Sequence, residues 1–274
     1  MSSTERSLCS SRLEKVSSKS FEQFSLLRYR LAPADVFKSV GPKLVPFFKA
    51  FCIYFVAGQS ENSNIFHAAI KILPIICLCG FVLLQGVTFE RYHDYSRRIF
   101  IGLILSAIGD ICLVWKKQFF IHGMLAFALA HLSYMRAFGF QPLKPLTGII
   151  CFLITVPFYH VYFPNLKGLL IVAVPIYIVI ISIMVWRAVT GLQAQLWSDE
   201  GLWRWTKLCS CLGAVTFGIS DMIIGLHMFC FPVPYAQIFI MSTYYAGQLG
   251  IALSTFSLDD EYHLRMKHIV LKKD

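Results

Sequence analysis

The sequence predicts an all-α, polytopic membrane protein of about eight transmembrane helices. Hydrophobic residues make up 57% of the 274 residues and charged residues only 15%, which is the composition of a membrane protein and not that of a soluble domain. Apolar runs of roughly 20 residues, the length that a spanning helix needs, follow one another from residue 44 to residue 256. Short polar or Pro- and Gly-containing breaks separate these runs.

The breaks between the apolar runs divide the chain into three regions. The predicted spans lie near residues 42–58, 65–86, 99–115, 118–139, 145–164, 168–189, 205–226 and 234–256. Residues 1–40 are Ser-rich and mixed in charge, which predicts a disordered cytosolic tail. Residues 41–256 are expected to form the eight-helix membrane domain, and residues 257–274 a second cytosolic tail.

The formal net charge of +10 has two candidate explanations, nucleic-acid binding and membrane orientation. The basic residues are concentrated in both tails and in alternate connections between the spans. On the side of the N-terminus lie Arg91, Arg97, Arg98, Arg136, Lys144, Arg187, Arg204 and Lys207. The opposite connections contain only Lys116, Lys117 and Lys167. The positive-inside rule therefore predicts that both termini are cytosolic, and no nucleic-acid partner is expected.

Two carboxylates stand inside otherwise uncharged apolar runs. Asp110 is the only charge in "IGLILSAIGDICLVW" (101–115), and Asp221 is the only charge in "CLGAVTFGISDMIIGL" (211–226). Asp110 is about eleven residues into its span, which at about 1.5 Å per residue is roughly 17 Å and close to the bilayer centre. A carboxylate there costs about 2.5–3.5 kcal/mol, so it should face the bundle interior or a wet cavity. Hydrogen bonding between helices is the structural alternative for each acid.

The two acids also define an internal repeat. At an offset of 111 residues (221 minus 110), several further positions match without a gap. The matches are Gly102 with Gly213, Ile108 with Ile219, Tyr134 with Tyr245, Gly139 with Gly250, and "PFFK" (46–49) with "PFYH" (157–160). An offset of four spans preserves the direction of each helix, so the sequence predicts two parallel four-helix repeats with both acids at similar depth. Two acids at equivalent positions favour a functional role over a purely structural one.

A pair of acids in a poorly hydrated site can divide the two roles of acid-base catalysis. Burial and mutual repulsion disfavour joint ionisation, so one carboxyl can keep its proton beside an ionised partner. This arrangement suits general acid cleavage of acid-labile C–O bonds, as in glycoside hydrolysis. A nucleophilic serine is not indicated, since the sequence has no G-x-S-x-G. A zinc pair is not indicated either, because His122 and His131 are nine residues apart and H-E-x-x-H is absent.

Three further intramembrane polar residues are candidates for binding a substrate. Lys71, in "AIKILPIICL" (69–78), could pair with an acid or hold a lipid phosphate, although its side chain could also extend to the nearer interface. Tyr134 and Tyr245 are equivalent in the repeat and could donate hydrogen bonds into the cavity, with packing as the alternative. The sequence thus predicts Asp110 and Asp221 as catalytic residues, Lys71, Tyr134 and Tyr245 as substrate-binding residues, and no metal site.

Six segments within residues 41–256 form an ordered set of motifs. They are "GPKLVPFFKAFCIYF", "IKILPIICL", "RRIFIGLILSAIGDICLVW", "HGMLAFALAHLSYMRAFGF", "SDMIIGLHMFCFPVPY" and "IMSTYYAGQLGIALS". This set resembles the lysoplasmalogenase (YhhN-like) family of integral membrane proteins, in particular its vertebrate members. The resemblance implies an eight-helix hydrolase that cleaves the vinyl ether bond of lysoplasmalogens, releasing a fatty aldehyde and glycerophosphoethanolamine or glycerophosphocholine. It also implies a lysophospholipid substrate within the membrane, no cofactor, residence in the endoplasmic reticulum, and catalytic roles for the acids that match Asp110 and Asp221.

The resemblance agrees with the chemistry expected from the two acids. A vinyl ether is broken when its terminal alkene carbon is protonated and water captures the resulting oxocarbenium ion; one Asp would give the proton while the other stabilises the cation. Which acid does which is left open. A proton-coupled transporter of lipids or small molecules is the main alternative, and a receptor or scaffold is a further one. The basic cytoplasmic connections favour entry of the substrate from the cytosolic leaflet.

Overall fold

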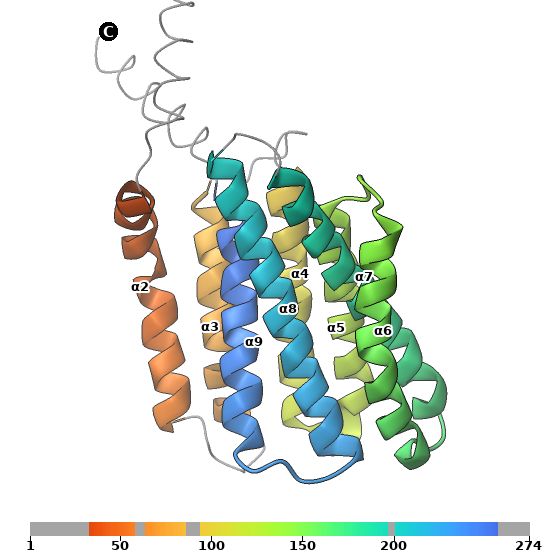
Figure 1. Cartoon of the computed structure of the whole chain (residues 1–274). Coiled ribbons are helices and arrows are strands. Elements are labelled where there is room, and N and C mark those ends of the chain that lie inside the picture. The colour runs from red at the N-terminus through yellow and green to blue at the C-terminus, as the bar shows by residue number, and fades with distance from the viewer. Residues whose placement is uncertain (1–32, 58–63, 86–93, 197–200, 257–274) are drawn as a thin grey trace, which may run out of the picture.

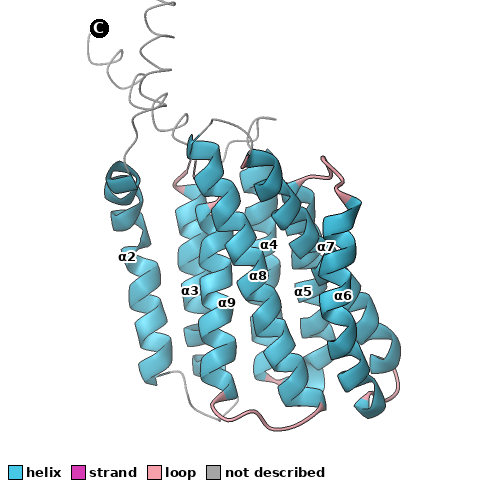
Figure 2. Cartoon of the chain, in the orientation of Figure 1, coloured by secondary structure: helices cyan, strands magenta, loops and turns pink. Residues whose placement is uncertain are grey.

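Eight α-helices make up the described part of the chain (Figure 1). The computed structural model describes residues 33–57, 64–85, 94–196 and 201–256. The helices are α2 (Pro33–Ala57), α3 (Ile65–Leu83), α4 (Asp94–Val114), α5 (Lys116–Phe138), α6 (Pro145–Tyr162), α7 (Leu170–Gln195), α8 (Gly201–Phe229) and α9 (Ala236–Leu253), with a 3₁₀ turn η2 (Phe163–Asn165). No strand occurs in these residues, as Figure 2 shows. The predicted all-α class is confirmed, and each predicted span overlaps one helix in the same order.

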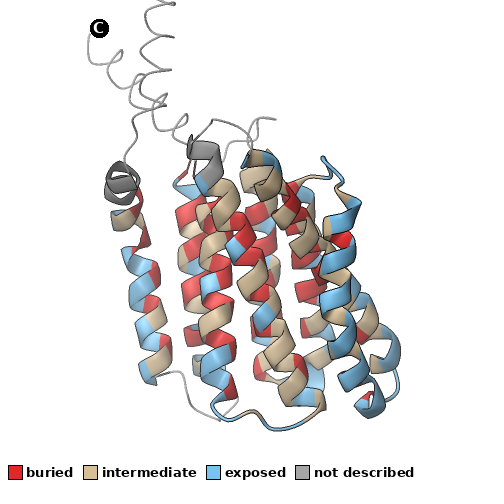
Figure 3. Cartoon of the chain, in the orientation of Figure 1, coloured by how far each residue is buried: buried red, intermediate tan, exposed pale blue. Residues whose placement is uncertain are grey.

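The outer surface of the bundle is apolar, as a lipid environment requires. Five helices, α2, α3, α6, α7 and α8, contain a stretch long and apolar enough to cross a membrane. Large apolar side chains such as Ile104, Leu153 and Val172 are exposed, and α6 presents exposed residues along much of its length (Figure 3). The chain is therefore a multi-pass membrane protein. That all eight helices cross the membrane stays a prediction.

The other three helices, α4, α5 and α9, carry polar side chains of the bundle interior. Asp110 lies in α4, His131 in α5 and Gln248 in α9, and all three are buried. Polar residues in membrane spans face the interior of the bundle, because lipid cannot provide hydrogen-bond partners. These three helices therefore contribute polar groups to the interior of the bundle.

Local sequence explains several helix ends. Asn64 caps α3, since its side-chain oxygen accepts a hydrogen bond of 2.7 Å from the backbone N–H of His67. At the other end of the bundle, α5 stops at Gly139, whose φ of +83° is readily adopted only by glycine. Pro145 begins α6, where a missing N–H costs no hydrogen bond.

The first helix begins earlier than the sequence indicated. It starts at Pro33, inside the tail predicted for residues 1–40. Residues 1–32 and the predicted C-terminal tail, residues 257–274, lie outside the described residues. Their expected disorder and cytosolic location stay predictions.

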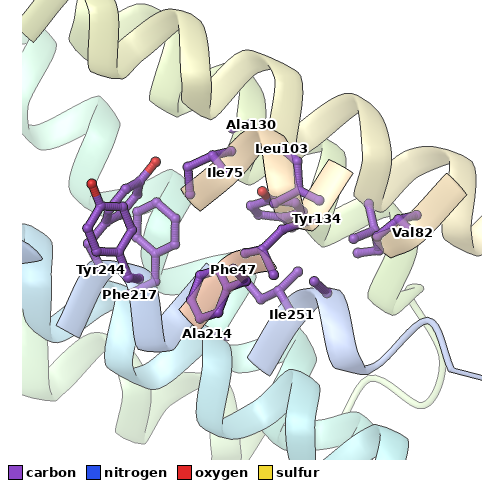
Figure 4. Packing of buried hydrophobic residues seen from close by; sticks show 14 of the residues in the cluster. Phe47, Ile75, Val82, Leu103, Ala130, Tyr134, Ala214, Phe217, Tyr244 and Ile251 are labelled. Carbon is purple, nitrogen blue, oxygen red and sulfur yellow. The ribbon is translucent and has the colours of Figure 1, made fainter. Parts of the chain in front are cut away.

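A buried core joins helices from both halves of the chain. Figure 4 shows Tyr244 of α9 beside Phe217 of α8, and the Phe217 ring centroid lies 6.1 Å from that of Phe127 in α5, a helix of the first half. The order of neighbouring helices is also the same in each half. In the first half α2 packs on α3, α3 on α4 and α4 on α5, and in the second half α6 packs on α7, α7 on α8 and α8 on α9. This order is what a parallel repeat would produce, and the repeat itself stays a prediction.

Glycine residues let α8 and α9 come into backbone contact. A Cβ atom added at Gly213 would lie 2.6 Å from the backbone nitrogen of Ile251 and 2.7 Å from the carbonyl oxygen of Gly247. The backbone of α9 thus occupies the space that a side chain would need, which is typical of close helix pairs in membranes. In contrast, a Cβ added at Gly80 of α3 would meet no atom within 4 Å.

We expect Gly213→Ala to lower the free energy of unfolding by about 1–3 kcal/mol, because the added methyl group forces α8 and α9 apart. Gly80→Ala is the matched control: the same methyl group enters open space and should leave the stability unchanged or slightly higher. Thermal unfolding of both variants in detergent measures the difference. Equal melting temperatures would contradict the proposed contact between the two backbones.

Candidate active site

Asp110 and Asp221 border the same cavity. Asp110 lies near the end of α4 and Asp221 near the end of α8, at the end of the bundle where α8 is joined to α9 (the lower end in Figure 1). Asp110 is therefore nearer to a helix end than the predicted depth at the bilayer centre, because α4 begins earlier than the predicted span, at Asp94. The cavity has a volume of about 880 Å³, and α3, α4, α5, α8 and α9 contribute to its walls. It reaches the surface at the exposed residues Lys117 and Tyr235. The structure therefore brings the two intramembrane acids to one polar space.

Asp110 belongs to a buried ion pair. Lys71 Nζ lies 3.1 Å from Asp110 Oδ1, and the Tyr244 hydroxyl donates a hydrogen bond of 2.6 Å to Asp110 Oδ2. Only 7% of the Lys71 side chain and 3% of the Asp110 side chain are exposed. Buried charges require an opposite charge and hydrogen-bond partners nearby. Lys71 and Tyr244 thus supply the opposite charge and the hydrogen bond that a buried carboxyl group requires.

Asp221 has a different set of partners. The Tyr177 hydroxyl donates a hydrogen bond of 2.6 Å to Asp221 Oδ2, and Nε2 of His131 lies 3.2 Å from the same oxygen. No hydrogen bond joins Asp221 Oδ1 to any described residue, and 14% of the Asp221 side chain is exposed. Asp221 therefore borders the cavity with one carboxyl oxygen that no described side chain engages.

His131 connects α5 to Asp221. Its Nε2 lies 3.0 Å from the Tyr177 oxygen as well as close to the carboxyl group. The ring is fully buried and packs against Phe217, with ring centroids 4.7 Å apart. Nδ1 has no hydrogen-bond partner among the described residues. These contacts indicate that the imidazole hydrogen is on Nε2, which then donates a hydrogen bond to Asp221.

The three predicted substrate-binding residues lie in different places. Lys71 borders the cavity and pairs with Asp110, which is one of the two roles that the sequence suggested for it. Tyr134 and Tyr245 are fully buried and are not among the residues that border the cavity. The Tyr134 hydroxyl donates to Gln248 Oε1 at 2.8 Å, and the Tyr245 hydroxyl donates to the Lys71 carbonyl oxygen at 2.7 Å. Both tyrosines thus hold helices together.

Sequence reasoning missed three residues that contact the acids. Tyr244 directly precedes the predicted Tyr245, and the comparison of the two halves selected Tyr245 only because it matches Tyr134. Tyr177 stands in the uniformly apolar start of α7 and has no distinguishing signal in the sequence. The spacing of His131 from His122 bears only on metal binding, whereas in the structure His131 contacts a carboxyl group.

The chain is similar in sequence to several named proteins over most of its length. The model described as "YhhN family" matches residues 66–255. The chain is 48% identical over 226 residues to lysoplasmalogenase TMEM86A of Bos taurus, which covers 82% of this chain and 92% of the relative. It is 46% identical to the Homo sapiens TMEM86A over the same shares of both chains. Lysoplasmalogenase TMEM86B of Homo sapiens is 34% identical over 77% of this chain and 85% of its own length. No solved structure gives a significant match. The family match and these identities show that the chain belongs to the YhhN family.

Proposed function

We propose that the protein is a lysoplasmalogenase, a membrane hydrolase that cleaves the vinyl ether bond of lysoplasmalogens. The products would be a fatty aldehyde and glycerophosphoethanolamine or glycerophosphocholine. Relatives that bear the name lysoplasmalogenase match most of the chain. The observation that carries the proposal is the pair of carboxyl groups, Asp110 and Asp221, at one polar cavity inside an apolar bundle.

The different partners of the two acids suggest how they divide the reaction. Asp221 accepts hydrogen bonds at Oδ2 only, so its Oδ1 can carry a proton toward the cavity. That proton passes to the alkene carbon farther from the ether oxygen and leaves an oxocarbenium ion. The carboxylate of Asp110, held by Lys71 and Tyr244, stabilises the cation and orients a water molecule. Water adds to the carbon next to oxygen and returns a proton to Asp221, and the hemiacetal collapses to aldehyde and alcohol.

The position of the cavity at one end of the bundle indicates from which leaflet the substrate enters. With both termini in the cytosol, as the distribution of basic residues predicts, the end where α8 joins α9 faces away from the cytosol. The cavity then opens toward the lumenal leaflet of an endoplasmic reticulum membrane. This position favours the leaflet opposite to the one that the basic connections alone suggested.

The test of the proposed function is a comparison of three lysophospholipids that differ at one linkage. Protein purified in detergent should release glycerophosphocholine from the 1-alkenyl lipid. It should not act on the 1-alkyl analogue, which has no double bond to protonate, nor on the 1-acyl analogue. Release at similar rates from the alkenyl and acyl lipids would contradict the vinyl ether mechanism. Absence of turnover with all three would favour the proton-coupled transporter.

Tyr177→Phe is expected to reduce kcat about 10- to 150-fold, because the lost hydrogen bond to the Asp221 carboxyl group is worth about 1.5–3 kcal/mol. Tyr134→Phe serves as the comparison, since the Tyr134 hydroxyl reaches Gln248 and not the cavity. Turnover of the 1-alkenyl lipid by each variant, measured at matched folded fraction, gives the two ratios. A larger loss in Tyr134→Phe than in Tyr177→Phe would contradict these assignments.

A further inference from the structure

A second, apolar cavity begins at Asp221. It has a volume of about 100 Å³ and lies mainly between α5, α6, α7 and α8. Aromatic and aliphatic side chains form most of its walls, among them Phe158, Val174 and Ile178. Of the described residues that border it, Asp221 alone is charged. The space is thus suited to a hydrocarbon chain and has a carboxyl group at its edge.

The apolar cavity shares a wall with the polar cavity. The residues that border both are Leu113, Phe120, Phe127, Asp221 and Ile224. The residues that border the polar cavity and not the apolar one include Asp110, Lys71, Lys116 and Lys117. The lysine side chains are therefore confined to the polar side, and the one acid at the boundary is Asp221.

We propose that the apolar cavity holds the alkenyl chain of the substrate, with the vinyl ether beside Asp221; this inference rests on the proposed lysoplasmalogenase activity. A lysoplasmalogen consists of one apolar chain and one glycerophosphate head, and the vinyl ether joins them. The chain gains from burial among apolar side chains, and the phosphate gains from the ammonium groups of Lys116 and Lys117. When each part occupies the matching cavity, the vinyl ether lies at the shared wall.

This placement distinguishes the two acids by position. Asp221 is at the junction where the reacting alkene carbon lies, whereas Asp110 faces only the polar cavity that holds the head and the attacking water. This position is consistent with Asp221 as the proton donor, the role that its hydrogen bonds also suggest. The placement also makes the apolar cavity a determinant of specificity for the chain.

The volume of the apolar cavity sets the length of chain that it can hold. Since a cavity of about 150 Å³ holds one benzene molecule, the volume of about 100 Å³ accommodates roughly four methylene-sized groups. Longer chains would continue past the cavity without further contact there. Catalytic efficiency should therefore rise with chain length and then become constant.

Gly218 offers a way to shorten the apolar cavity. It borders this cavity from α8, and a Cβ atom added there would make only an ordinary contact, 3.6 Å from Val185 Cγ2. A leucine at this position would project into the cavity and replace part of the chain. Gly80 of α3 is the matched control, because an added Cβ meets no atom within 4 Å and the residue borders neither cavity.

The test is the dependence of kcat/KM on chain length for monomeric 1-alkenyl glycerophosphocholines of about 4 to about 12 carbons. For the wild type we expect a rise of about fourfold or less per methylene, ending when roughly four methylene groups follow the vinyl ether. In Gly218→Leu most of this rise should be absent, since a leucine side chain adds about four carbon atoms. Gly80→Leu should reproduce the wild-type curve. If Gly218→Leu instead disturbed Asp221, kcat/KM would fall by the same factor for every chain length, so the two effects can be distinguished.

Identical curves for Gly218→Leu and the wild type, or no rise in the wild type, would overturn the inference and leave the proposed function standing. Absence of hydrolysis with every chain would overturn both. Photolabelling of the wild type by a 1-alkyl analogue with a diazirine in the middle of the chain does not depend on any variant. Labelled peptides from α6 and α7 are expected, and labels confined to α2, α3 or α9 would overturn the inference.

Discussion

Asp221→Asn is expected to reduce turnover of the 1-alkenyl lysophospholipid by a factor of about 10²–10⁴, because an amide cannot give the alkene carbon the proton that a carboxylic acid gives. Asparagine keeps the size of the side chain, and its oxygen can still accept the hydrogen bond from Tyr177. The variant should therefore fold as the wild type does. A coupled assay of aldehyde release measures kcat, and thermal unfolding of the same preparation measures stability.

Asp94→Asn is the matched control for this variant. Asp94 is in the first turn of α4, pairs with Arg97 at 2.6 Å, and about 41% of its side chain is exposed. Exposed ion pairs contribute about 0–1 kcal/mol, and Asp94 is far along α4 from Asp110, so turnover should stay at the wild-type level. Full activity of Asp221→Asn would exclude Asp221 as the proton donor.

Lys71→Met is expected to lower the free energy of unfolding by about 3–5 kcal/mol, because it leaves the Asp110 carboxylate buried without its cation. Asp110 joins three helices: α4 carries it, Lys71 comes from α3, and Tyr244 comes from α9. Loss of the ion pair should therefore loosen the packing around the polar cavity. Chemical or thermal unfolding in detergent measures the change in stability.

The double variant Lys71→Met/Asp110→Asn separates the stability of the ion pair from its chemical role. Removal of both charges leaves no unpaired ion, so most of the lost stability should return. Turnover should not return, because the carboxylate that stabilises the oxocarbenium ion is gone. If the protein were a scaffold that uses Asp110 only to join helices, the variants would change in stability alone, because the wild type would have no turnover. A single variant Lys71→Met as stable as the wild type would contradict the energetic importance of the pair.

The sequence predicted the fold class and the meeting of the two acids, because both depend on features that a single chain displays. Apolar runs of spanning length specify helices in a membrane, and a lone carboxyl in such a run must face inward. The offset of 111 residues between Asp110 and Asp221 then indicated equivalent places in the bundle (221 minus 110). Both acids border one cavity, as that reasoning required.

The partners of the acids could not be predicted in the same way, since the two halves differ where function requires a difference. Lys71, which pairs with Asp110, corresponds in the repeat to Ser182, and Tyr177, which contacts Asp221, corresponds to Phe66. A comparison of the two halves identifies only residues that are alike in both, and Lys71 and Tyr177 have no like residue in the other half. The comparison identified Tyr134 and Tyr245 instead, whose hydroxyl groups join helices. Side-chain direction within a helix bundle depends on tertiary packing that single-sequence patterns do not encode.

The most direct test of vinyl ether protonation within the cavity is hydrolysis in heavy water. The aldehyde is reduced to the alcohol as it forms, so that later exchange with solvent does not alter the label. Protonation of the alkene by an acid in exchange with solvent places a single deuterium on the carbon next to the aldehyde carbon. We expect that label in essentially every product molecule of the wild-type reaction. Aldehyde formed without deuterium at this carbon would contradict hydrolysis by acid protonation of the vinyl ether.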